Sequence, residues 1–490
     1  MSPYARILLP CMLALAACSE DAPPALPDSA PSDKVPVTTS SLAARVAFIQ
    51  GRDQYEALHY AEAAMLFDQA IELDPDFALA HLMRATVTES AEQFYESLGK
   101  AEAVMVAASP GEQIIIQSFV AAAQNDIDGQ YEKLKKLEVL YRHDERVHMR
   151  LGNFYMGQQR FVDAAHHFLD AIDINAQFAP AWNMLGYAHR GNGDYSAAKK
   201  AFRRYIDLVP DEPNPFDSYA ELLMEAGDYD ASIESYRRAL SIAPDFPPSH
   251  IGLIINYSLK GEHENAIAAA ENLFLKARNM PERQIALIRL SGAHLHAQDQ
   301  DAALAALDRL ASLALEQENL PVLAAARELA GDILLVVGET DAALGQYKAA
   351  LEIRRESPIS RSAKSQAGRQ FLFKATLAAL QSGRADDAAS YLAQYRAEAR
   401  SGNAFEQRRI QELEGYSALL AEDYELAVEK LAAGNQMEPV VRYFSALACE
   451  GMGDYQRARD HAEAAAFRNT LAISLPYFRP QALEMLERLP

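Results

Sequence analysis

The stretch APAWNMLGYAHRGNGDYSAAKKAFRRYIDLVP, residues 179–210, decides the fold of this chain. It contains two helix-like halves separated by Gly-Asn-Gly-Asp, residues that supply left-handed turn conformations. Gly186 and Ala198 are small, as the crossing point of two closely packed helices requires. Phe202 fills the wedge between hairpins, and Pro210 ends the second helix because it cannot continue the hydrogen-bond ladder. The stretch therefore predicts an antiparallel helix hairpin.

The same pattern recurs every 34 residues through the middle of the chain. The matching small and aromatic positions of the two neighbouring units are Gly152, Ala164, Phe168, Ala220, Ser232 and Tyr236. Self-similarity at this period indicates a helical-repeat array, because one helix pair cannot bury its own apolar face and must stack on the next. We expect an all-α solenoid of about a dozen helix hairpins between Ser41 and Thr470.

The clearest unit resembles the tetratricopeptide repeat. Trp182, Leu185 and Gly186 have the W-x2-L-G spacing of that family, and the later Ala, Phe and Pro follow at the family offsets. Only His189 and Tyr205 depart from the pattern. The resemblance implies an all-α superhelical solenoid of this repeat type, in which the first helix of each hairpin lines a concave groove.

The repeat signature weakens towards the C-terminus. The 34-residue step after Ala220 reaches Ile254, where a small residue is expected. From there to Gly331 the spacing is irregular, with Gly292 as the candidate small residue of the middle hairpin. Longer helices are therefore expected in this part of the chain.

These patterns divide the chain into seven segments. They are a lipoprotein-type signal peptide (1–17), a Pro/Ser-rich tether (18–41), an N-terminal repeat block (42–280), longer repeat-like hairpins (281–357), a basic interruption (358–366), a C-terminal repeat block (367–470) and a capping helix (471–490). The interruption is interpreted as a solvated linker with helix-end cations; a hinge and a docking patch for an acidic partner are the alternatives.

The N-terminus carries a targeting pattern. Arg6 precedes an apolar run, residues 7–17, that is too short to span a bilayer as a helix, and Leu-Ala-Ala leads directly to Cys18. This junction resembles the lipobox of bacterial lipoproteins, which implies that Cys18 is lipidated and that the chain is cleaved before it. Cleavage near Ala16 without a lipid, and no cleavage at all, are the alternatives. In the family view, Ser19 after the cysteine is typical of export to the outer membrane, so we expect a lipid-anchored protein of the cell envelope on the periplasmic face of that membrane.

Composition and motifs argue against several function classes. The net charge of −22 would repel a nucleic-acid backbone. The sequence contains no phosphate loop, no dinucleotide fingerprint and no H-E-x-x-H or C-x-x-C zinc motif. Within the pairs His166/His167 and His294/His296 the spacing does not favour a shared metal, and Cys449 fits a buried apolar role. Repeats use nearly all of residues 41–490, so we predict a non-catalytic protein with no cofactor and no metal.

The groove positions of the three clearest units give the candidate protein-binding residues. They are Met149, Asn153, Met156, Asn183, Tyr187, Arg190, Asp217, Glu221 and Met224. Some family members clamp a terminal carboxylate with Lys, Asn and Arg, and only Asn153 matches that clamp here. Asp217 and Glu221 bring the wrong charge, so we expect this groove not to hold an acidic C-terminal peptide. Met, Tyr and Asn instead suit an extended or helical protein segment; the alternative is that these residues mainly pack and solvate the groove.

The sequence therefore predicts a lipid-anchored scaffold or adaptor that binds protein or peptide partners in the bacterial cell envelope. A regulatory or sensor module that binds a soluble ligand or a signalling enzyme is the alternative. Nothing in the sequence indicates the oligomeric state or the partners' identities.

Overall fold

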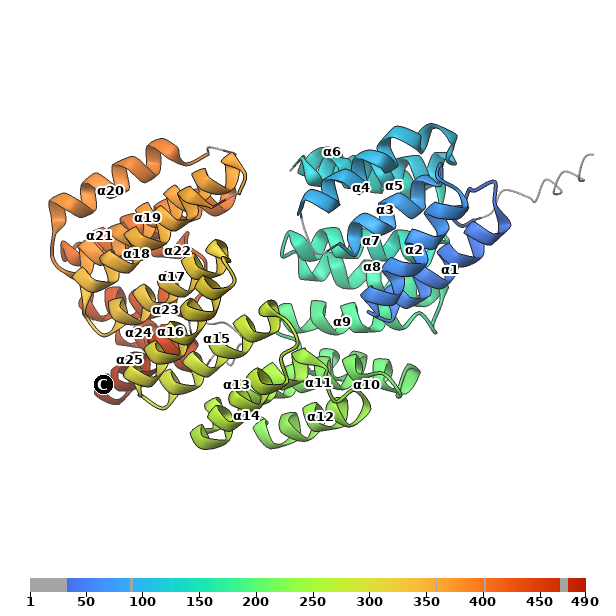
Figure 1. Ribbon diagram of the computed structural model, residues 1–490. Coiled ribbons are helices and arrows are strands. Elements are labelled where there is room, and N and C mark those ends of the chain that lie inside the picture. Colours follow the sequence, from blue (N-terminus) through green and yellow to red (C-terminus); the bar gives the residue numbers. More distant parts are fainter. Residues whose placement is uncertain (1–32, 89–90, 125, 358, 401, 468–474) are drawn as a thin grey trace, which may run out of the picture. The chain divides into compact units, whose positions relative to one another are not determined.

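The computed structural model describes residues 33–88, 91–124, 126–357, 359–400, 402–467 and 475–490. Within these residues it contains 25 α-helices, one short 3-10 helix and no strand, which confirms the predicted all-α class (Figure 1). The predicted signal peptide, Cys18 and the tether as far as residue 32 lie outside the described residues. None of the described helices is long and apolar enough to cross a membrane.

The chain divides into two compact units, residues 1–147 and 148–490. The helices of the first unit are α1 (Leu42–Glu56), α2 (Tyr60–Leu73), α3 (Ala78–Thr86), α4 (Ala91–Val104), α5 (Pro110–Ala123) and α6 (Ile127–Leu140). The boundary between the two units lies between Val147 and His148, inside helix α7 (Glu145–Gly157).

The second unit continues through the rest of the chain. Its next helices are α8 (Phe161–Ile174), α9 (Ala179–Gly191), α10 (Tyr195–Leu208), α11 (Pro213–Glu225), α12 (Tyr229–Ile242), α13 (Pro247–Lys260), α14 (His263–Lys276), α15 (Met280–His296) and α16 (Gln300–Glu316). The remaining helices are α17 (Leu320–Val336), α18 (Thr340–Glu356), α19 (Arg361–Gln381), α20 (Ala385–Glu398), α21 (Ala404–Leu420), α22 (Tyr424–Ala432), α23 (Pro439–Gly451), α24 (Tyr455–Phe467) and α25 (Leu475–Arg488). Taken in order, α1 to α24 make twelve helix–turn–helix pairs, as predicted.

A ring packed on a glycine sets the helix spacing inside a hairpin. A Cβ atom added at Gly186 of α9 would lie 2.5 Å from Cε1 of Phe202 on α10, and one added at Gly331 of α17 would lie 2.5 Å from Cε1 of Tyr347 on α18. Both rings are fully or almost fully buried. The small residue therefore lets the second helix approach until its aromatic side chain touches the first helix's backbone.

The hairpin of α13 and α14 uses the opposite arrangement of sizes. Ile254, where a small residue was expected, is buried, and Ala270, sixteen residues later, stands where the other units carry an aromatic ring. Both belong to one apolar cluster. A large residue on the first helix and a small one on the second conserve the filled volume, which cores tolerate well. The large and the small residue have therefore exchanged helices, and the contact between the two positions is kept.

Gly292 is not the small residue at which the two helices of its hairpin meet. A Cβ atom added there would meet nothing within 4 Å, whereas the neighbouring Ser291 is buried. Of these two neighbours, the buried small residue is therefore Ser291. The four helices from α15 to α18 have 17 residues each, compared with 13 or 14 in α7 to α14. Residues 361–366, assigned to the basic interruption, form the first turns of α19, which Ser360 caps.

The end of the predicted tether is docked on the first unit. The backbone N–H groups of Val35, Thr38 and Ser40 donate to side-chain oxygens of Asp144 (2.8 Å), Glu112 (2.8 Å) and Asp74 (3.1 Å), respectively. Lys34 also forms an ion pair with Glu145. Buried carboxylates at successive helix junctions thus hold residues 34–40 as an extended strip, so this part is not a free leash.

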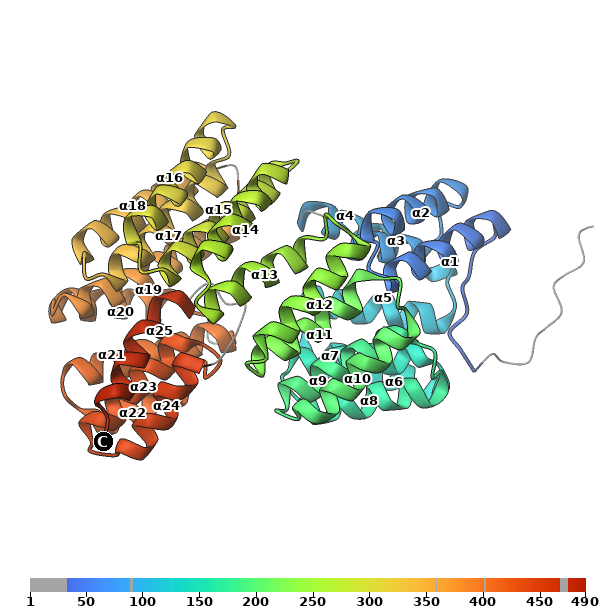
Figure 2. The same cartoon turned by 90° about the horizontal axis from the view of Figure 1, so that it is seen from below.

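The C-terminal helix α25 covers the end of the array and also returns to earlier repeats of the second unit. Figure 2 shows α25 beside α23 and α24. Met485 and Leu489 pack with Cys449 and neighbouring alanines of these two helices. At its other end Phe478 packs on the cluster of Ile333 in α17 and α15 residues. This helix is therefore more than the predicted terminal cap.

We predict that Gly186→Ala destabilises the second unit by about 1–3 kcal/mol, because the added methyl group overlaps the Phe202 ring. The matched control is Gly292→Ala, which meets open space in a helix and should stabilise by up to about 1 kcal/mol. Urea unfolding of the two variants measures both effects. Equal unfolding midpoints for the two variants would contradict the role given to the glycine–aromatic contact.

Candidate protein-binding grooves

The predicted groove residues lie on the first helices of three successive hairpins, α7, α9 and α11. On α9 and α11 some of them form bonds between the two helices. The buried hydroxyl of Tyr187 donates to Ser218 Oγ at 3.0 Å, and Arg190 Nη1 forms an ion pair with Glu221 Oε2 at 2.6 Å. The Arg190 guanidinium also lies 4.8 Å from the centre of the Tyr187 ring. The groove wall is therefore tied together from one repeat to the next.

Asp217 continues these links from α11 to α13. Its Oδ1 atom accepts a hydrogen bond from Ser249 Oγ at 2.6 Å, and the side chain is buried. Burial raises the pKa of Asp217 to about 7; the Ser249 hydrogen bond opposes this shift and the Glu221 charge adds to it. The carboxyl group therefore titrates near neutral pH.

The other predicted residues have mixed positions. Asn153 is exposed, and Met149 and Met156 are half-buried on α7. Met224 is only 1% exposed because it packs against Ile255 and Leu259 of α13, so it cannot line an open surface. Asn183 is buried and its Oδ1 atom has no hydrogen-bond partner in the described structure. The site assignment as a whole stays a prediction.

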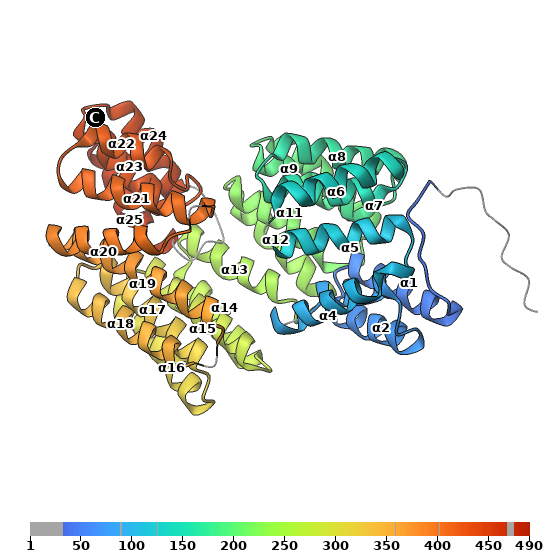
Figure 3. The same ribbon diagram turned by 90° about the horizontal axis from the view of Figure 1, so that it is seen from above.

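A second candidate binding surface, which the sequence did not indicate, lies on the first helices of the later hairpins. It holds a cavity of about 220 Å³ between residues of α17, α19, α21, α23 and α25. Helices α19 and α21, drawn in orange in Figure 3, contact each other. Their residues supply half of the lining of this cavity. The apolar lining consists of Leu335, Val336, Phe373, Leu377, Phe405, Tyr416, Val440, Val441 and Phe478. We call this the aromatic pocket.

Charged side chains border the aromatic pocket. Lys374 is neutralised by Asp332 at 2.6 Å. Arg409 lies over the rings of Phe373 (4.2 Å) and Phe405 (4.6 Å). Arg408 is exposed and forms no ion pair with any residue in the described ranges. The pocket therefore combines an apolar interior with an accessible positive charge.

Glu412 also lines the pocket and is buried. Its Oε1 atom accepts a hydrogen bond from the backbone N–H of Asn435 at 2.8 Å. Burial raises the pKa of Glu412 above its ordinary value, although that hydrogen bond and Arg409 oppose the shift.

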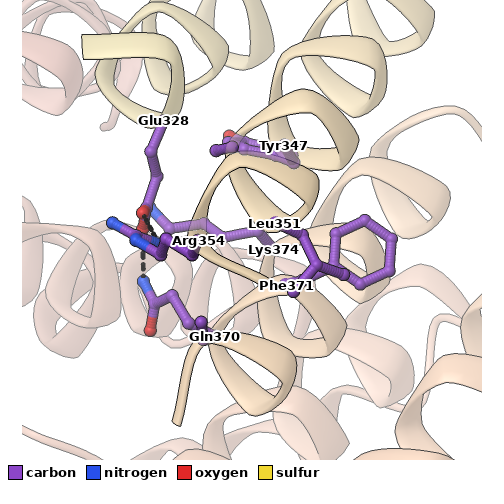
Figure 4. Close-up of a pocket in the computed structure, with 9 residues that line it drawn as sticks. Glu328, Tyr347, Leu351, Arg354, Gln370, Phe371 and Lys374 are labelled. Atoms are coloured by element: carbon purple, nitrogen blue, oxygen red, sulfur yellow. Dashed lines mark hydrogen bonds and ion pairs between the residues drawn. The ribbon is translucent and has the colours of Figure 1, made fainter. Parts of the chain in front are cut away.

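The basic residues around the predicted interruption mostly bind within the protein. Arg354 forms an ion pair with Glu328 at 2.5 Å, and Gln370 Nε2 donates to the same carboxylate at 2.9 Å (Figure 4). Arg369 pairs with Glu406 at 3.0 Å, and Lys374 with Asp332. The cavity beside Arg354 is only about 10 Å³. These contacts favour a structural role over the docking patch.

Cys449 is buried, as expected, but it has a basic neighbour that the sequence did not indicate. Arg457 Nη2 lies 3.7 Å from its sulfur. Burial nevertheless raises the pKa of the Cys449 thiol, so the thiolate is disfavoured. This agrees with a packing role.

The stacked helix hairpins form an all-α repeat array. The tetratricopeptide-repeat family model matches residues 50–112, 149–213 and 183–247. The chain therefore carries tetratricopeptide repeats, and proteins with such repeats are in general non-catalytic scaffolds that bind protein or peptide partners.

Among solved structures, MamA is 22% identical to this chain and covers 33% of it and 90% of its own length, with a TM-score of 0.29. A tetratricopeptide-repeat protein from Parabacteroides merdae is 14% identical and covers 52% of this chain and 96% of its own, with a TM-score of 0.39. The pilF protein of Pseudomonas aeruginosa is 17% identical and covers 50% and 96%, with a TM-score of 0.29. No curated protein sequence matches the chain.

We predict that Asp217→Asn stabilises the second unit relative to the unchanged protein as the pH rises from 4 to 8. The native carboxyl group has a raised pKa, so the folded state binds its proton more tightly than the unfolded state does, and stability falls as pH rises through this window. The asparagine keeps the acceptor for Ser249 and removes the charge. The full difference is about 4 kcal/mol.

Urea titrations at pH 4, 6 and 8 measure this difference. The matched control is Asp211→Asn, which changes an exposed carboxylate in the preceding turn. If the midpoints of Asp217→Asn and the unchanged protein stayed a constant interval apart over this range, the buried acid would not be the cause.

Proposed function

We propose that this chain is a lipid-anchored, non-catalytic adaptor of the bacterial cell envelope that binds a protein segment in the aromatic pocket. The observation that carries the proposal is the cavity of about 220 Å³ on the inner face of α17 to α23. In tetratricopeptide repeats the first helices face the partner, and the cavity lies on such helices.

The chemistry of the pocket specifies the segment. The rings of Phe373, Phe405 and Tyr416 favour a large apolar or aromatic side chain. Arg408, on the exposed border, favours an acidic group next to that side chain. The occupied hydrogen bonds of Tyr187, Arg190 and Asp217 make the earlier groove a weaker candidate than this pocket.

The anchoring part of the proposal rests on sequence alone. The short apolar run, the small residues and Cys18 have the order of a lipoprotein signal. Several acyl chains on one cysteine give durable membrane attachment, whereas a single chain gives marginal attachment. A membrane-held scaffold raises the effective concentration of its partners there.

We predict that a photo-reactive phenylalanine analogue at position 405 crosslinks to a protein partner in the bacterium that makes the chain. Phe405 is 50% exposed and borders the pocket, so the fold tolerates the change. The matched control is the analogue at position 315, because Leu315 of α16 is 56% exposed and lies outside the pocket lining. Adding Arg408→Glu should reduce the yield of crosslinked product several-fold.

Equal crosslinking from positions 405 and 315 would count against the pocket as the binding site. A small molecule that fills the pocket in the purified protein, without any protein adduct from position 405, would favour the sensor alternative instead.

We predict that Cys18→Ala releases the protein from sedimented membranes, because the substituted chain has no thiol for the lipid. The aromatic pocket remains intact in this variant, so crosslinking from position 405 in a purified mixture should persist. Cys449→Ala is the control, since it removes the buried thiol and leaves Cys18. Continued sedimentation of Cys18→Ala with membranes would refute the anchoring.

A further inference from the structure

Two histidines and a carboxylate meet on the first hairpin of the second unit. His148 belongs to α7, and His167 and Asp170 belong to α8. The two Nδ1 atoms lie 3.5 Å apart, and Asp170 Oδ2 lies 3.5 Å from His148 Nδ1 and 3.7 Å from His167 Nδ1. Three potential metal-ligand atoms thus form a nearly equilateral triangle.

The size of this triangle matches a transition-metal site. A cation at its centre would lie about 2.1 Å from all three atoms, the length of Zn–N and Zn–O bonds in proteins. Two imidazole nitrogens and one carboxylate oxygen form a donor set that favours zinc over magnesium or calcium. Three protein ligands leave a fourth position for water or for a ligand from outside.

The surroundings hold the imidazoles in place and leave a route for an ion. The His148 and His167 side chains are 8% and 13% exposed, whereas Asp170 is 52% exposed. Tyr155 stacks on the His167 ring with 5.4 Å between ring centres and an angle of 9°. The nearby cation Arg160 lies over the Tyr155 ring and pairs with Asp163. Packing against a ligand's ring favours a preformed site.

We propose that His148, His167 and Asp170 bind a zinc ion that joins α7 to α8. The earlier expectation of no metal considered His167 only with its sequence neighbour His166. The hairpin instead places His167 opposite His148, nineteen residues earlier. Bound zinc would crosslink the two helices of the hairpin and so stiffen the start of the second unit, independently of the aromatic pocket.

Calorimetric titration of the full chain with zinc, after treatment with a chelator, tests the site. We expect one equivalent to bind with high affinity and to raise the melting temperature. His167→Asn and Asp170→Asn should each weaken binding by at least about tenfold. The matched control His166→Asn, which changes the exposed neighbour on α8, should bind as the unchanged protein does.

Cobalt gives an independent readout, because two nitrogens and one oxygen around it produce the visible absorption of a low-coordinate site. The Asp170→Asn variant should fold normally, because it replaces a half-exposed side chain by one of the same shape, so a loss of binding in this variant reports on the metal ligand. If zinc binding persisted unchanged in Asp170→Asn and His167→Asn, or if the unchanged protein bound no zinc, the three side chains would form only a hydrogen-bonded cluster and the proposal would be wrong.

Discussion

The close approach of an aromatic ring to the helix that faces it is the contact on which this structure depends. Within a hairpin, Phe202 or Tyr347 touches the glycine sixteen residues earlier, so no side chain separates the helices there. The ring then extends towards the next hairpin, so each helix pair packs against the pair that follows it. Stability accordingly accumulates along the chain, and the inner face is left for other interactions. Where the contact is reversed, as at Ile254 and Ala270, the stack continues because the filled volume is the same.

The inner face differs between the two stretches of the second unit. Along α9, α11 and α13 the side chains of Tyr187, Arg190 and Asp217 bond to Ser218, Glu221 and Ser249, respectively, so each link joins the first helix of one hairpin to the first helix of the next. Along α17 to α21 ion pairs such as Lys374–Asp332 and Arg369–Glu406 also join successive first helices. Here, however, aromatic rings line a cavity of about 220 Å³ between these helices. Phe478 of the returning α25 closes one side of it.

Much of the fold could be predicted because its information is local and repeated. Gly186 and Phe202 identify their partners by spacing alone, and the number of hairpins follows. The failures came where the contact is not periodic: Gly292 faces open space although its type suggested a crossing, and the buried Ser291 beside it carried no signal. The predicted groove positions fall on the first helices of their hairpins, but whether a side chain such as Met224 is exposed or covered depends on the next helix. The contact of His148 with His167 depends on how α7 and α8 are rotated about their axes, and the aromatic pocket depends also on the position of α25. A sequence pattern contains neither piece of information.

The docked strip at residues 34–40 alters the geometry of attachment. Asp74, Glu112 and Asp144 hold its backbone, so the chain is fixed to the first unit from Lys34 onward, sixteen residues after Cys18. Sixteen peptide steps span at most roughly 55 Å when fully stretched. If Cys18 carries the proposed lipid, the docked strip can lie no farther than this distance from the bilayer surface.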